Sequence, residues 1–130
     1  MLAAIGIVFA GLAALLHAYI FVLESIRWMH PSTRRTFGVR SEDDARTMKS
    51  LAFNQGFYNL FLGLITAVGI IVRLTGIVPI GTTLMLTGTG TMLAAALVLA
   101  LSDRSKLRAA MTQGLVPLLA VLFLTAATVA

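Results

Sequence analysis

The chain has 130 residues, a mean hydropathy of +0.95 and a charged fraction of only 12%. Soluble domains carry about twice that charged fraction, and one domain of this length has no core large enough to bury so much apolar sequence. Its formal net charge is +5, and the absence of cysteine excludes disulfides, a thiolate nucleophile and thiolate metal sites. The composition therefore predicts a single integral membrane domain over residues 1–130.

Four long segments contain no Asp, Glu, Lys or Arg. Roughly 18 such residues predict a membrane-spanning helix, because the hydrocarbon core is about 30 Å thick and a helix rises about 1.5 Å per residue. No Lys or Arg precedes Arg27, as a signal peptide would require, so we expect the first segment to be retained. We predict an all-α fold with four transmembrane helices, at about residues 2–28, 46–73, 79–102 and 108–129.

The first span is predicted to end near Trp28, whose amphipathic ring is favoured at a membrane interface. Pro31 disfavours helix at the residue before it, and residues 29–45 are predicted to form a basic cytoplasmic loop. Ser41 precedes three acidic residues, a pattern typical of a helix N-cap. We expect the helix that begins there to continue into the second span.

The other two connections are short. A turn at Thr75 and Gly76 precedes the third span, and a turn around Asp103 precedes the fourth. Pro117 lies inside the fourth span, where it should kink the helix or free a carbonyl group. Short connections place successive helices side by side, so the predicted architecture is an up-down four-helix bundle.

The basic residues lie almost entirely on one side of the predicted membrane. Nine of the ten Lys and Arg residues fall in or beside the first and third connections, and Arg73 alone falls at the second. The positive-inside rule makes the basic side cytoplasmic and places both termini on the non-cytoplasmic side. This charge favours membrane lipids as partners. The chain has no basic face interleaved with aromatic residues, so we expect no nucleic-acid partner.

Polar side chains occur in the spans where lipid makes them costly. The first span carries His17 and Glu24, seven residues apart on one face, with Arg27 three residues further on. The fourth span carries Gln113. The second span carries a polar stripe that a helix confines to an arc of about 140°, made up of Asn54, Gln55, Tyr58 and Asn59.

The helical rise places these groups at matching depths. With Arg27 and Ser50 taken as the cytoplasmic boundaries, Glu24 lies about 5 Å deep and Asn54 about 6 Å deep. His17 lies about 15 Å deep, level with the end of the polar stripe. We predict one polar pocket near the cytoplasmic face, with ligand contacts from Arg27, Asn54, Gln55, Asn59 and Gln113.

Three of the polar side chains suit catalysis. Glu24 is an intramembrane carboxylate, His17 is an imidazole able to relay a proton, and Tyr58 has a hydroxyl able to donate to an oxyanion. The alternative is structural, since Asn, Gln and His in spans commonly hydrogen-bond between helices, and Arg27 can neutralise Glu24. The sequence leaves both interpretations open.

No metal or cofactor motif accompanies these residues. His17, Glu24 and His30 do not make a metal site, because two ligands separated by two helical turns need a third from elsewhere. The sequence has no glycine-rich phosphate loop, no GxSxG and no HExxH. We therefore expect neither a metal nor a cofactor.

The segments His17–Glu24 and Asn54–Leu62, with Trp28 after the first, resemble a family of small bacterial membrane proteins catalogued as domain of unknown function 1304. The resemblance covers essentially the whole chain. It implies four helices, a multi-pass location in the bacterial inner (cytoplasmic) membrane and no established activity.

The architecture is also similar to that of the membrane-associated eicosanoid and glutathione metabolism proteins, which are four-helix trimers with sites between subunits. Arg46 and the Gln55–Asn59 segment resemble their second-helix motif, but Tyr58 stands where that motif has a glutamate. The analogy, and the small size of the chain, imply a homo-oligomer.

Three functions remain open. The first is an oligomeric membrane protein that binds a lipid-like or amphipathic small molecule in the polar pocket, with acid–base chemistry through Glu24 and His17. The second is a proton- or cation-coupled transporter or channel subunit that uses Glu24. The third is a non-catalytic membrane scaffold in which the polar groups only join helices.

Overall fold

The computed structural model describes residues 1–130 and is helical along nearly its whole length. Its four longest helical segments are each long and apolar enough to cross a membrane, which confirms the predicted all-α class and the four helices. The elements are α1 (Leu2–Phe21), the π-helical turn η1 (Val22–Ile26), α2 (Pro31–Phe37), α3 (Glu42–Leu74), α4 (Val78–Ser102), the 3₁₀ turn η2 (Arg104–Lys106) and α5 (Leu107–Val129).

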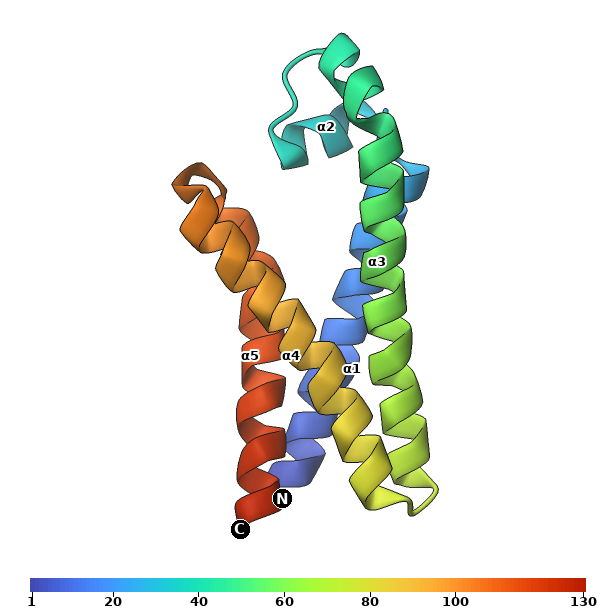
Figure 1. Cartoon of the computed structure of the whole chain (residues 1–130), viewed down its shortest axis with the longest axis vertical. Coiled ribbons are helices and arrows are strands. Elements are labelled where there is room, and N and C mark those ends of the chain that lie inside the picture. The colour runs from blue at the N-terminus through green and yellow to red at the C-terminus, as the bar shows by residue number, and fades with distance from the viewer.

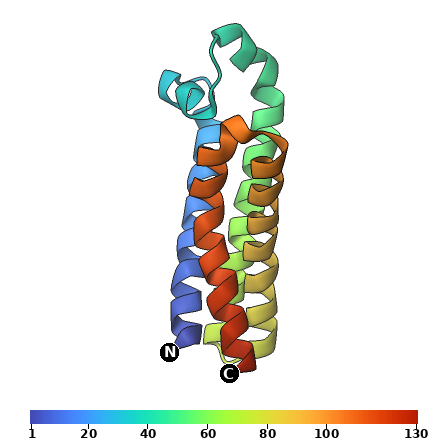
Figure 2. The same ribbon diagram turned by 90° about the vertical axis from the view of Figure 1, so that its left-hand side faces the viewer.

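The four long helices form an up-down bundle (Figures 1 and 2). Helix α3 packs between α1 and α4, and α5 packs between α4 and α1, so each long helix has two neighbours. Both termini lie at one end of the bundle, here called the termini end (Figure 1). The opposite end carries α2 and η2. We call it the basic end, because residues 27–49 and 104–108 hold nine of the ten cations.

Local signals explain how the helices of the basic end begin and end. Ser41 Oγ accepts a hydrogen bond from Asp44 N at 3.0 Å, so the predicted cap starts α3, with acids in its first turn. The segment predicted as a loop contains the short helix α2, with Pro31 at its first position. Gly38 ends α2 with a left-handed φ of 71°, which glycine adopts without steric cost.

Close packing of small residues joins the helices at the termini end. A Cβ added to Gly69 of α3 would lie 2.7 Å from Met85 N and 2.9 Å from Gly81 O, both on α4. The two backbones can approach this closely only because no side chain separates them. Beside this contact, α1, α4 and α5 share a buried cluster of Ala10, Met85, Ala120 and Leu124.

The helices separate toward the basic end. Figure 1 shows the upper halves of α4 and α5 diverging together from α1 and α3. The last buried residue of α4 is Ala96, and a Cβ on Gly114 of α5 would lie 2.7 Å from its Cβ, so α4 and α5 stay in contact. The bundle is therefore two helix pairs, α1–α3 and α4–α5, which join at the termini end and part at the basic end.

Candidate functional site

The first span changes helical type at its polar end. Arg27 N donates to Val22 O at 2.8 Å, a bond between residues five apart, and residues Val22–Ile26 form the π-helical turn η1. Turns of this kind close some helix C-termini, and inside helices they are frequent at functional sites. The hydrophobic pattern does not indicate this turn. It contains Glu24 and the neighbouring Ser25.

Of the four residues of the polar stripe on α3, Asn59 is the one that bonds the Glu24 side chain. Asn59 Nδ2 donates to Glu24 Oε2 at 2.9 Å, and also contacts Gln55 O on its own helix at 3.1 Å. Both side chains are half-buried. The sequence placed Glu24 level with Asn54, whereas Gly56 lies beside Glu24 and Ser25, a shift of two residues, or about 3 Å. The Glu24 side chain tilts toward the N-terminus of its own helix and so reaches Asn59, further along α3.

Ser25 makes a second link to α3 that the sequence analysis missed. Its Oγ donates to Phe53 O at 2.8 Å. A Cβ on Gly56 would lie 3.1 Å from Glu24 Cβ and from Ser25 N, so this glycine allows α3 to approach the π turn closely. A serine beside the only carboxylate of the span was the available signal.

His17 lies in the bundle interior, with 2% of its surface exposed. Its Nδ1 lies 3.0 Å from Ala13 O, and a carbonyl can only accept, so Nδ1 carries the hydrogen. In a neutral ring Nε2 is then an acceptor, and the hydrogen bond of the ring within the chain is made by Nδ1. Seven residues separate His17 from Glu24, about 10 Å along the axis, so the two side chains are not in contact.

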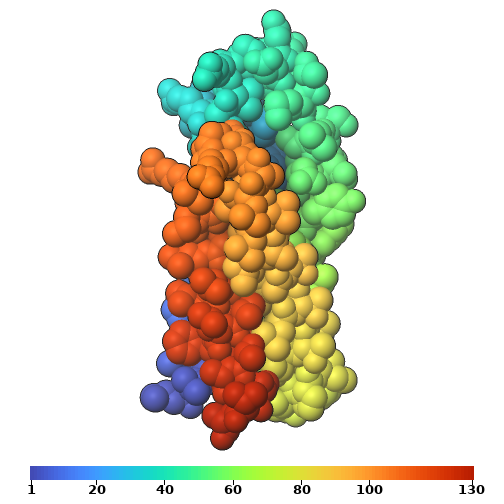
Figure 3. Space-filling view, turned by 60° about the vertical axis from the view of Figure 1, so that its left-hand side comes forward, coloured from blue at the N-terminus to red at the C-terminus, as the bar shows by residue number.

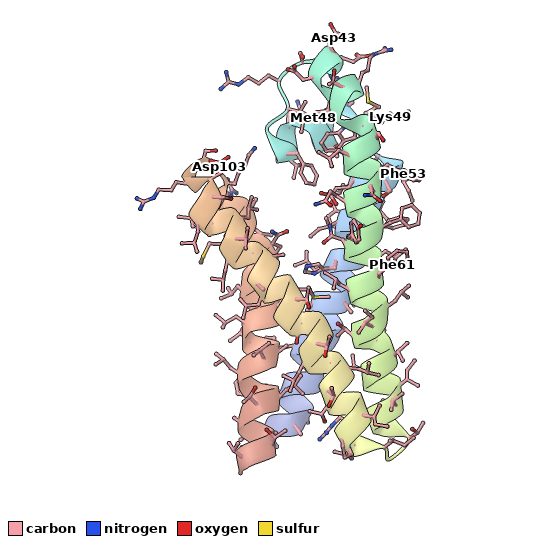
Figure 4. All side chains as sticks on the ribbon, in the orientation of Figure 1. Asp43, Met48, Lys49, Phe53, Phe61 and Asp103 are labelled. Atoms are coloured by element: carbon pink, nitrogen blue, oxygen red, sulfur yellow. The ribbon has the colours of Figure 1, made fainter.

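The other predicted site residues are more exposed than His17. Arg27, Asn54 and Gln55 are exposed, Tyr58 is 58% exposed, and Gln113 on α5 is half-buried. Arg27 does not neutralise Glu24, because the single salt bridge of the chain joins Arg46 to Glu42 at 2.7 Å. Figure 4 shows Phe53 and Phe61 of α3 projecting outward from the bundle. The structure thus brings together Glu24 and Asn59, with His17 buried below them.

This arrangement suits proton or hydrogen-bond exchange. Only Oε2 of Glu24 is hydrogen-bonded, which leaves Oε1 available to a hydroxyl, an amine or a proton. No group of three His, Cys, Asp or Glu side chains is placed to hold a metal ion. The hydrogen-bonded carboxylate of Glu24 lies at a π turn, where the two helix pairs part. It is therefore the group in the spans that is best placed for chemistry.

Two surface hollows lie at the ends of the molecule. One, of about 550 Å³, lies at the basic end beside η2. The other, of about 410 Å³, lies at the termini end, where Arg73 Nη1 donates to Thr82 Oγ1. Neither is lined by Glu24 or His17.

Fold and site together define an all-helical bundle with four helices able to span a membrane and a carboxylate–amide pair between two of them. The chain belongs to the family described as protein of unknown function (DUF1304), whose sequence profile matches residues 11–125. This confirms the family resemblance drawn from the sequence. Comparisons with curated proteins and with solved structures gave no match.

Proposed function

We propose that this chain is a multi-pass membrane protein that assembles with copies of itself and binds a lipid-like or amphipathic small molecule at Glu24 and Asn59. The observation that carries the proposal is the hydrogen bond of 2.9 Å between these side chains, at a π turn and where the α4–α5 pair diverges. An intramembrane carboxylate is rare and usually functional. Its free Oε1 would accept from the polar head of the ligand.

Acid–base chemistry at this site would rest on Glu24. His17 is about 10 Å further along the helix, and its Nδ1 is occupied by Ala13 O. The free Oε1 of the carboxylate is the better-placed proton acceptor. We therefore assign Glu24 the primary role and His17 that of a second proton acceptor through Nε2.

The charge distribution supports the orientation. The basic end holds every Lys and Arg except Arg73. We infer that this end faces the cytoplasm and that both termini lie on the opposite side of a bacterial inner membrane. The Glu24 site is then reached from the cytoplasmic leaflet.

Self-association follows from the outer face of α3. Asn54 and Tyr58 lie about 160° around the helix from Gly56, which packs on η1. In a membrane their polar groups would face hydrocarbon, where an unsatisfied group costs several kcal/mol. An Asn amide both donates and accepts, so the same face of a second copy can satisfy it. We infer that a second copy covers this face.

The binding proposal is tested by native mass spectrometry of the protein in mild detergent. Glu24→Gln keeps a carbonyl oxygen for Asn59 but removes the negative charge, whereas Glu24→Leu removes both. We expect wild type to retain a defined extra mass and Glu24→Gln to lose it while staying folded. Glu42→Gln, which changes an exposed carboxylate outside the site, is the matched control.

The alternatives give different results. In a scaffold, Glu24→Gln behaves as wild type, no mass is retained, and only Glu24→Leu and Asn59→Leu lower stability. In a transporter, proteoliposomes with wild-type protein show a proton or cation flux that Glu24→Gln abolishes. A folded Glu24→Gln variant that keeps the bound mass would refute the binding site.

Self-association is tested in the same spectra by subunit count. We expect Asn54→Leu with Tyr58→Phe to change the oligomer distribution. Thr112→Val is the control, because this exposed hydroxyl donates to Arg108 O of its own helix at 2.9 Å. An unchanged distribution in the double variant would assign the subunit contact to another face.

A further inference from the structure

The hollow of about 550 Å³ at the basic end lies between the turn after α2 and η2. Figure 3 shows η2 and the adjoining ends of α4 and α5 directly beneath the α2 segment. The hollow therefore joins parts of the molecule that belong to different helix pairs. Its lining residues are Arg35, Gly38, Val39, Arg40, Ser105 and Lys106.

Three cations face this space without an acid among the lining residues. Two acids lie two residues from the lining residues, and both are occupied. Glu42 pairs with Arg46, and Ser105 N and Oγ donate to Asp103 Oδ1 at 2.9 Å and 2.6 Å. These bonds from Ser105 hold the pKa of Asp103 below its ordinary value of 3.8. Arg35 and Arg40 have no carboxylate partner in the chain. An anion in the hollow would relieve the mutual repulsion of the three cations.

The walls of the hollow are held by specific contacts. Lys106 Nζ donates to Phe37 O at 2.9 Å and so ties η2 to the end of α2. The Phe37 ring packs against Trp28, with 5.5 Å between centroids, and Trp28 Nε1 donates to Ala45 O at 2.8 Å. Trp28 is 5% exposed. The segment that carries Arg35 and Arg40 is therefore anchored on both α1 and α3.

We propose that this hollow binds a phosphate group. Two guanidinium groups and one ammonium group suit the oxygens of a phosphate, because Arg offers paired N–H donors and Lys a compact charge. The head group of an anionic phospholipid and a free phosphate compound share this chemistry. The site does not depend on any ligand at Glu24, since none of its residues contacts that side chain.

The test uses the full-length protein in detergent, with phosphatidylglycerol, phosphatidylcholine and inorganic phosphate as separate probes. Native mass spectrometry counts the lipid retained, and thermal unfolding follows phosphate binding. The lining variants are Arg35→Gln with Arg40→Gln, and separately Arg40→Gln alone, which removes no hydrogen bond of the fold. Arg104→Gln and Arg108→Gln are matched controls, because these cations lie beside the hollow and do not line it.

We expect the double variant to lose at least about tenfold in apparent affinity, with a smaller loss for Arg40→Gln and little change in the controls. Retention of phosphatidylglycerol over phosphatidylcholine identifies a lipid head group. A rise in Tm with inorganic phosphate, without lipid preference, identifies a free phosphate compound. No binding of either probe, or equal losses in lining and control variants, would overturn the proposal.

Discussion

The termini end and the basic end of this bundle are held together by different interactions. At the termini end, backbones and small side chains are in direct contact, as where Gly69 of α3 lies against Met85 and Gly81 of α4. At the basic end the two helix pairs part, and close contact persists only inside each pair, as where Gly56 lies against Glu24 and Ser25. The bond from Asn59 to Glu24 lies within the α1–α3 pair, and the bond from Lys106 to Phe37 O joins the two pairs.

The contacts that hold the two helix pairs together and the candidate binding sites therefore lie at opposite ends of the bundle. Close packing is intolerant of added volume, whereas hydrogen bonds between separated helices can be replaced by bonds to a ligand. The candidate sites at Glu24 and at the phosphate hollow both lie at the end where the two helix pairs part. Substitutions in the contact between the pairs should therefore cost most at the termini end.

The largest effect is expected for Gly69→Ala. The new Cβ would meet Met85 N at 2.7 Å, and backbone cannot move aside as a flexible side chain does. We expect a loss of about 1–3 kcal/mol in the free energy of unfolding, measured by denaturant titration in detergent micelles. Gly90→Ala is the control, because nothing lies within 4 Å of its Cβ position. That variant should gain about 0.5–1 kcal/mol through helix propensity. Equal losses of unfolding free energy in both variants would show that close helix contact does not stabilise the termini end.

A second prediction concerns the hydrogen bond between α1 and α3. Glu24→Leu and Asn59→Leu, measured singly and together, should give a coupling energy of about 0.6–2 kcal/mol, because interhelical hydrogen bonds in membranes have this strength. Glu24→Gln should retain most of the coupling through its amide oxygen. A coupling indistinguishable from zero would mean that the bond does not hold the helices together.

Trp28→Phe tests how the phosphate hollow is supported. The variant keeps an aromatic ring but loses the bond of 2.8 Å to Ala45 O, so we expect a cost of about 1 kcal/mol. The segment around Arg40 should also be cleaved faster by trypsin under native conditions. Tyr19→Phe, which alters an exposed hydroxyl elsewhere, should leave cleavage unchanged. Equal cleavage rates in the Trp28 variant would show that the anchor lies in other contacts.

The smallest effect is expected at Asp103. Its folded pKa is depressed by the two bonds from Ser105, so the carboxylate contributes stability above its ordinary pKa of 3.8 and loses it as pH falls through the folded value. Ser105→Ala should move the pKa of Asp103 up toward 3.8 with little change in stability at neutral pH. Titration of Asp103 by NMR measures the shift directly, and an unchanged pKa would assign the depression to another cause.

The sequence predicted the parts of the fold that membrane physics dictates. Long uncharged segments mark the spans, and the cap at Ser41 follows from local hydrogen bonding, so both were readable without tertiary information. The register of α1 against α3 was not, because it is set by the contact of Gly56 with Glu24 and Ser25. For this reason Glu24 was matched with Asn54, although its side chain bonds Asn59.

The sequence predicted which residue types form the candidate site but not how they are arranged. A costly carboxylate at Glu24 and a polar stripe on the next span indicate a site by their presence alone. Which members of the stripe face α1 is decided by Gly56, which turns Asn54 and Tyr58 outward. The phosphate hollow depends on the contact of η2 with the end of α2, between Lys106 and Phe37. These residues are 69 positions apart, and no local sequence pattern predicts such a contact.

The π turn η1 sets the direction in which the end of the first span faces. A turn closed between residues five apart holds one residue more than an α-helical turn, so everything after it is rotated by about 100° relative to an uninterrupted helix. Deletion of one residue there would restore a regular helix with Trp28 still on the side of Ala45, whereas an added residue would rotate Trp28 away from it. Insertions should therefore be tolerated in the turn after Leu74 but not between His17 and Trp28, where each one turns the end of the span by about 100°.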